Sequence, residues 1–180
     1  MVPAVCTPGK TRAKEILKKQ VAGRSSSCHA RAVVLIVLHH HFRPGGVRRV
    51  IELATPHLVA HRAGRIRAVV LAGGERPDAG WLKAFEERLG GSLVRVVVEP
   101  AFGYVGETPW AAGFVLRLRR AISALLECRG GDEGVVWAHN LGLGRNLWLA
   151  RELSVGCERA GVLLVAHHHD WWFENRWHHY

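Results

Sequence analysis

The chain has 180 residues, 48% of them hydrophobic, and carries 25 Lys and Arg against 15 Asp and Glu, a formal net charge of +10. This length suits one domain with a sizeable core and excludes two, while the charge favours an anionic partner such as a nucleotide diphosphate or an acidic lipid headgroup. No stretch reaches the roughly 18 apolar residues of a membrane-spanning helix, and the N-terminus lacks the apolar region of a secretory signal. The sequence therefore predicts a cytoplasmic protein.

The first segment, residues 1–30, is strongly basic. It holds six Lys and Arg residues against the single acid Glu15, together with the serine run 25–27. This composition predicts a disordered tail that can touch an anionic membrane at its inner face. The predicted domain then spans 31–180.

Short apolar runs alternate with stretches long enough for helices along the rest of the chain. We expect strands near 32–39, 66–72, 93–98, 134–138 and 162–167, and helices near 46–62, 78–90, 109–128 and 146–160. Pro56 lies inside the first helical stretch and predicts a kink or an early end there. The alternation predicts an α/β, Rossmann-like fold: a doubly wound, mostly parallel sheet flanked by helices.

In such sheets, ligands bind beyond the carboxyl ends of the strands, where the strand order reverses. A sequential doubly wound order makes the first and fourth strands neighbours at this point, with the fifth strand beside the fourth. Three loops, 39–46, 139–146 and 167–176, are then predicted to converge on one crevice. Nine of the twelve histidines lie in or beside these loops, at 39–41, 139, 167–169, 178 and 179.

Gly45 and Gly46 stand between the first predicted strand and the first predicted helix. Glycines here allow the backbone N–H groups of a helix N-terminus to approach an anion closely, so the pair predicts a phosphate contact. A tight strand-to-helix connection that binds nothing is the alternative explanation for the same two residues.

Three segments, in order, resemble one protein family. They are His-Phe-Arg-Pro-Gly-Gly-Val-Arg-Arg-Val-Ile from residue 41, Val-Trp-Ala-His-Asn-Leu-Gly-Leu-Gly-Arg-Asn from residue 136 and His-His-Asp-Trp-Trp-Phe-Glu-Asn-Arg from residue 168. Together they resemble the N-terminal, acceptor-side domain of GT-B glycosyltransferases, and most closely the retaining enzymes of family four. The resemblance covers about residues 31–180.

The resemblance implies an activity and roles for named residues. It implies transfer of a sugar from a nucleotide-sugar donor to a hydroxyl acceptor with retention, and it implies no further cofactor and no metal. Gly45 and Gly46 match the loop against the donor diphosphate, and His169 matches the histidine near the reaction centre. The acceptor side would be lined by His139, Asn140, Asp170, Glu174 and Arg176.

The chain departs from the family pattern in one respect. The family closes two domains around its substrates, and the second domain carries a Glu-x7-Glu motif. Glu99 and Glu107 have this spacing, but they flank a loop and not a helix start, so we treat the match as coincidence. The sequence therefore predicts a domain that is incomplete at its C-terminal end and that needs further chain or a partner chain.

Two alternatives to the transferase remain open at this point. One is a Rossmann-like module that binds a nucleotide or phosphorylated ligand without catalysis; the other is a metal-binding protein built from the triplets 39–41 and 167–169. Neighbouring residues of a strand point to opposite faces, so at most two histidines of each triplet can converge. Nucleic acid is not expected as a partner. The four cysteines lack metal or disulfide spacing and are expected to be free thiols.

Overall fold

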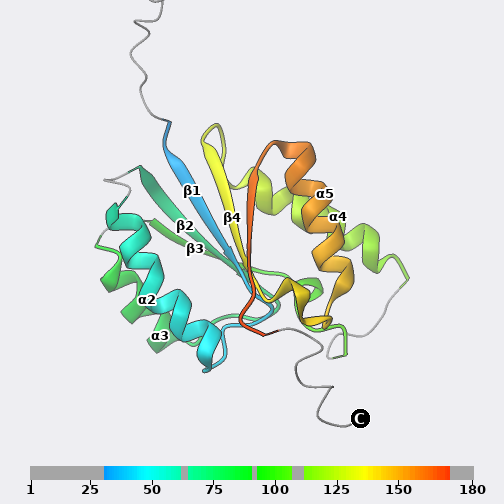
Figure 1. The fold of residues 1–180 in the computed structure, drawn as a ribbon, viewed down its shortest axis with the longest axis horizontal. Coiled ribbons are helices and arrows are strands. Elements are labelled where there is room, and N and C mark those ends of the chain that lie inside the picture. Colours follow the sequence, from blue (N-terminus) through cyan, green and yellow to red (C-terminus); the bar gives the residue numbers. More distant parts are fainter. Residues whose placement is uncertain (1–30, 62–64, 91–92, 107–111, 171–180) are drawn as a thin grey trace, which may run out of the picture. The chain divides into compact units, whose positions relative to one another are not determined.

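The computed structural model describes residues 31–61, 65–90, 93–106 and 112–170. Its centre is a five-stranded parallel sheet of order β3-β2-β1-β4-β5 (Figure 1). The strands are β1 Val33–Leu38, β2 Ile66–Gly73, β3 Leu93–Val98, β4 Glu133–His139 and β5 Leu163–His167. The predicted α/β class is confirmed, and so is the pairing of the first strand with the fourth and of the fourth with the fifth. The predictions for residues 1–30, and for Glu174 and Arg176, lie outside the described residues.

The strands form because their sequences are runs of β-branched and aliphatic residues that suit burial on both faces. Ile36 in the middle of β1 pairs with Val70 on β2 and with Val136 on β4, and all three side chains are fully buried. β3 and β5 are the two edge strands, and Leu163 and Val165 on β5 are exposed. β1 is the central strand, and the switch point lies between β1 and β4.

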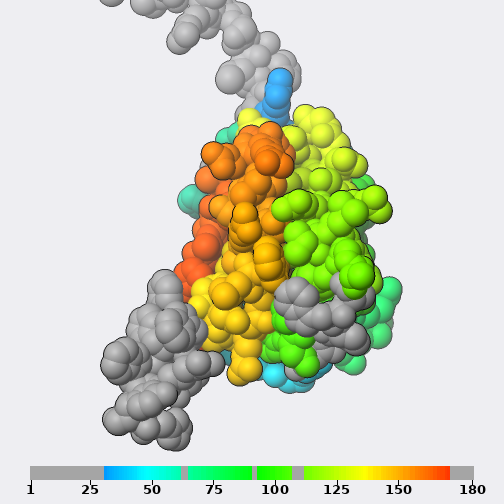
Figure 2. Space-filling model, turned by 90° about the vertical axis from the view of Figure 1, so that its right-hand side faces the viewer, coloured from blue at the N-terminus to red at the C-terminus, as the bar shows by residue number. Residues whose placement is uncertain are grey.

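Four helices among the described residues cover the two faces. α2 (Gly46–His61) and α3 (Ala79–Arg88) lie on one face, and α4 (Phe114–Glu127) and α5 (Leu147–Ala160) lie on the other (Figure 1). Figure 2 shows α4 and α5 side by side over their face, with β5 at its edge. This arrangement on both faces of a parallel sheet is doubly wound, as predicted.

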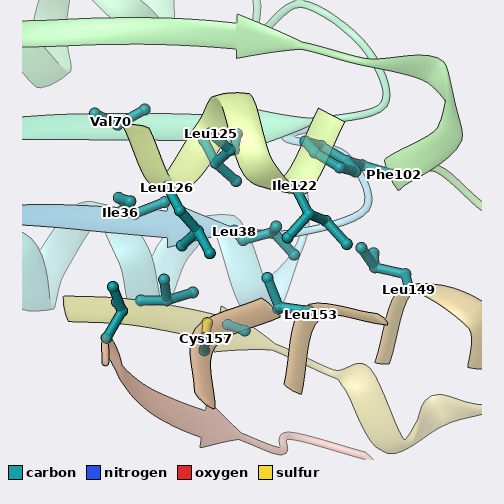
Figure 3. Packing of buried hydrophobic residues seen from close by; sticks show 14 of the residues in the cluster. Ile36, Leu38, Val70, Phe102, Ile122, Leu125, Leu126, Leu149, Leu153 and Cys157 are labelled. Carbon is teal, nitrogen blue, oxygen red and sulfur yellow. The ribbon is translucent and has the colours of Figure 1, made fainter. Parts of the chain in front are cut away.

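Two hydrophobic clusters hold these layers together. Alternate residues of β1 divide between them: Ile36 and Leu38 belong to the cluster beneath α4 and α5, and Leu35 and Val37 to the cluster beneath α2 and α3. Figure 3 shows the first cluster, in which Leu153 of α5 lies near Leu38. The core therefore fixes the sheet in one register, because a shift by one residue would exchange the two sets.

Some helix boundaries differ from the predicted ones. α2 continues through Pro56 to His61, so the predicted early end is wrong. α4 begins at Phe114 instead of near 109, after Gly113, whose φ of 86° stops the helix from extending backwards. Two short 3-10 turns, Pro100–Phe102 and Leu141–Leu143, follow β3 and β4 and were not predicted. Among the described helices, none is long and apolar enough to cross a lipid bilayer.

Candidate functional site

A cluster of imidazoles lies at the carboxyl ends of β1, β4 and β5. The ring of His139, at the end of β4, has its centroid 5.2 Å from those of His167 and His169 and 6.3 Å from that of His39. The rings of His167 and His169 stack with their centroids 4.2 Å apart. The parallel order of the strands produces this cluster, because it brings three strand ends to the same edge of the sheet.

Asn140 organises the loop after β5. It is the only non-glycine residue with a positive φ, 57°, among the described residues, and it is 3% exposed. Its side-chain oxygen accepts hydrogen bonds from the backbone N–H groups of His169 at 2.8 Å and Asp170 at 3.4 Å, and its amide nitrogen donates to the Asp170 carboxylate at 3.2 Å. Asn140 therefore positions His169 and Asp170, and its side-chain amide forms its hydrogen bonds within the protein.

His139 and His169 are joined directly by their side chains. Nδ1 of His139 lies 2.9 Å from Nε2 of His169, so one proton is shared between the two rings. The ring of His139 is completely buried, and its Nε2 has no hydrogen-bond partner among the described residues. A buried polar atom in this state costs about 1–3 kcal/mol in folding free energy, so the arrangement calls for an explanation beyond stability.

The cluster is held in its neutral form. Burial lowers the pKa of His139 to about 3, and repulsion from His39, His169 and His167 acts in the same direction. Burial also lowers the pKa of His39 to about 3, with contributions from His40 and His41. The pKa of His169 is lowered by burial and by His167. These three imidazoles are therefore uncharged near neutral pH, and each neutral ring has one nitrogen that donates and one that accepts.

The loop after β1 packs closely against the loops after β2 and β3. Nδ1 of His40 lies 2.9 Å from the carbonyl oxygen of Phe102, and the N–H of Gly74 donates to the carbonyl of His40 at 2.8 Å. A Cβ atom on Gly74 would lie 2.6 Å from Cα of Gly103, so only glycine fits there. A small cavity of about 180 Å³ remains between these loops, next to Tyr104.

Gly45 and Gly46 lie at the N-terminus of α2, at the same carboxyl edge of the sheet, and both are exposed. Neither has a positive φ, and a Cβ atom on Gly46 would meet nothing within 4 Å. Folding therefore does not require glycine at 46. The first turn of α2 contains no acidic side chain but includes Arg48 and Arg49, whose charges oppose the helix dipole and favour an anion nearby.

The structure thus brings His139, Asn140, His169 and Asp170 into direct contact, and places the glycine pair at the same edge of the sheet. His39, His40 and His167 join the site from triplets that the sequence had singled out. Tyr104 was missed: its ring contacts those of His40 and His41, and Arg145 lies over it at 5.7 Å. The only sequence signal for Tyr104 was its place in a polar loop after a strand.

A larger groove lies elsewhere, beside α2 on the face of β4 and β5. It has a volume of about 880 Å³ and is mostly apolar, and its lining includes Trp137, Leu163 and Val165. It contains none of the predicted site residues. The histidine cluster therefore lies at the carboxyl ends of the strands and not in this groove.

Comparisons of the chain with protein-family models, with curated proteins and with solved structures find no match.

Proposed function

We propose that this chain is the acceptor-side domain of a retaining GT-B glycosyltransferase, which moves a sugar from a nucleotide-sugar donor to a hydroxyl acceptor. The observation that carries the proposal is that the first two family-like segments, and residues 168–170 of the third, meet at one edge of the sheet. They follow β1, β4 and β5, on either side of the switch point, where ligands of such sheets bind.

The glycine pair is proposed to receive the donor diphosphate. The first N–H groups of α2 have no partner within the helix, and the N-terminal end of the helix dipole attracts negative charge. When the bond between sugar C1 and the diphosphate oxygen breaks, charge on the leaving group increases, and these donors stabilise it. The open space at Gly46 leaves room for a phosphate to approach the backbone.

His169 is proposed to position the donor sugar. Its backbone is fixed by Asn140, and the hydrogen bond to His139 favours the observed orientation of its half-buried ring. Because its pKa is lowered, it is neutral and can exchange hydrogen bonds with sugar hydroxyls. The carboxylate of Asp170 is exposed beside it and can accept a hydrogen bond from the acceptor.

In the proposed reaction the acceptor oxygen bonds to C1 on the face from which the diphosphate departs, and the acceptor proton leaves with the diphosphate. A second domain, from further chain or a partner chain, is part of the proposal and supplies most of the nucleotide contacts. The proposal includes a cytoplasmic location, with the basic residues of 1–30 able to meet an anionic membrane.

The test measures the binding of UDP, GDP and ADP, and of their sugar conjugates, to the purified chain. Ligand-observed NMR in a buffer that contains EDTA detects the binding. We expect one class of nucleotide to bind. Gly46→Ala should weaken the binding of its diphosphate. His169→Ala should remove the additional affinity that the sugar-linked form has over the free nucleotide. Gly131→Ala is the matched control, since Gly131 is exposed, has no positive φ and lies in the turn that leads into the opposite end of the sheet.

Two results would contradict the proposal. If Gly46→Ala and the wild type bind the nucleotide with equal affinity, the diphosphate does not bind at the N-terminus of α2. Binding of nucleotides with no difference between free and sugar-linked forms would favour the non-catalytic binding module instead.

A further inference from the structure

We propose that His139, His167 and His169 form a binding site for one divalent transition-metal ion, with Zn²⁺ as the ion that fits best. This inference does not rest on the glycosyltransferase proposal, and it departs from the expectation that the site holds no metal. One nitrogen of each ring lies within 4.8 Å of a nitrogen of the other two.

The spacing is close to that of a three-histidine site. Zn–N bonds are about 2.0–2.1 Å long, so two nitrogens on a tetrahedral ion are about 3.4 Å apart. Nδ1 of His139 and Nε2 of His169 are already 2.9 Å apart, sharing a proton where an ion would sit between them. Three imidazole ligands leave a fourth position for water or for an oxygen of a bound ligand.

The ring of His139 is completely buried at the end of β4, and its Nδ1 faces Nε2 of His169. Three imidazoles packed together without an acid between them repel one another when protonated, and they accept an ion only when neutral.

Hydrogen bonds with Asn140 hold the backbone of two of the proposed ligands, His167 and His169. Asn140 holds the backbone of His169, and its own N–H donates to the carbonyl of His167 at 2.9 Å. The carboxylate of Asp170, fixed by Asn140, adds negative charge close to His169. Such outer contacts orient metal ligands and raise affinity.

One movement is required for ligation. The rings of His167 and His169 stack with their planes 24° apart, so their lone pairs run nearly parallel and cannot meet at one ion. One ring must turn about its Cβ–Cγ bond. Both rings are only half-buried, so neither is locked in the core.

The test is a titration of the untagged full chain, stripped with EDTA, with Zn²⁺ in a calorimeter and with Co²⁺ by visible absorption. We expect one equivalent of each ion and the intense visible bands of four-coordinate Co²⁺. His167→Gln and His169→Gln should each weaken binding by at least about tenfold. His57→Gln is the control, because His57 is exposed on α2 away from the carboxyl ends of the strands.

Circular dichroism of each variant establishes that its fold is intact, and the half-buried positions 167 and 169 are chosen over the buried His139 for this reason. Failure of the stripped wild type to bind Zn²⁺ at micromolar concentration would overturn the proposal. So would unchanged binding in both variants, or an equal loss in His57→Gln. Nucleotide binding is measured in EDTA, which removes metal ions. A failure of the glycosyltransferase proposal can therefore be distinguished from a failure of the metal-site proposal.

Discussion

The side-chain oxygen of Asn140 lies 2.8 Å from the backbone nitrogen of His169, and this hydrogen bond ties the end of β4 to the loop after β5. The two residues are 29 positions apart in sequence, and no helix or strand contains both. The geometry of His169 therefore depends on a residue that needs no contact with any ligand. Asn140 also adopts the left-handed conformation that Asn tolerates better than most residues.

We predict that Asn140→Gly lowers the free energy of unfolding by about 1–3 kcal/mol, because its side-chain hydrogen bonds are lost while the positive φ is kept. Asn140→Ala should cost roughly 1 kcal/mol more, because alanine is strained at a φ of 57°. Urea denaturation measures both values. If the two variants are equally stable, the left-handed conformation at residue 140 is not maintained in solution.

We predict that metal-free protein loses stability as the pH falls from about 6.5 towards 3. The folded-state pKa values of His39 and His139 are about 3, below the ordinary value of 6.5, so the unfolded chain binds more protons in this interval. Protons therefore favour unfolding there, and stability is greatest above pH 6.5. Thermal unfolding across this range, in EDTA, measures the slope.

The matching variant is His39→Gln, which removes one of these buried titrating groups. It should flatten the dependence of the melting temperature on pH between about 6.5 and 3. Parallel slopes for wild type and His39→Gln would show that the His39 ring is protonated as readily in the folded as in the unfolded chain.

We predict opposite results for two glycines at the same edge of the sheet. Gly74→Ala should be strongly destabilising, because its Cβ atom would lie 2.6 Å from Cα of Gly103 and 3.0 Å from the carbonyl oxygen of His40. Gly46→Ala should leave stability unchanged or raise it by up to about 1 kcal/mol, because alanine favours the helix. Chemical denaturation compares the two variants. A stable Gly74→Ala protein would mean that the loops after β2 and β3 are farther apart than described.

We predict that Asn146→Ala costs more than the loss of a helix cap alone. Its side-chain oxygen accepts from the N–H of Leu149 at 3.0 Å and so caps α5, and its amide also donates to the carbonyls of Ala101 at 3.0 Å and Gly103 at 2.8 Å. The cap accounts for about 1 kcal/mol, and the bonds across to the loop after β3 should add a similar amount.

The control is Asp78→Ala at the N-cap of α3, whose side-chain oxygen accepts a hydrogen bond from the N–H of Trp81 at 2.8 Å. Urea denaturation should give a smaller loss for Asp78→Ala than for Asn146→Ala. Equal losses would mean that the contacts of Asn146 with the loop after β3 contribute nothing to stability.

Much of this fold could be predicted from local patterns. The run that became β1 is apolar at every position, as a central parallel strand requires, and the alternation of strands and helices gave the order in which β4 lies beside β1. The start of α5 was predictable because Asn146 is a good cap. The start of α4 was not, because the apolar pattern extends before Gly113 while the backbone at Gly113 turns away from the helix.

The sequence by itself determined that histidines would gather at the strand ends, because hydrophobic runs set the strands and parallel order sets which ends meet. The sequence also indicated that at most two histidines of each triplet could converge, because neighbouring residues of a strand point to opposite faces. Only the tertiary structure decided that the partner of His167 and His169 is His139 and not the triplet after β1, whose His40 is turned to the carbonyl of Phe102. The physical reason is that side-chain partners depend on the twist of neighbouring strands and on loop hydrogen bonds such as those of Asn140, which no local pattern encodes.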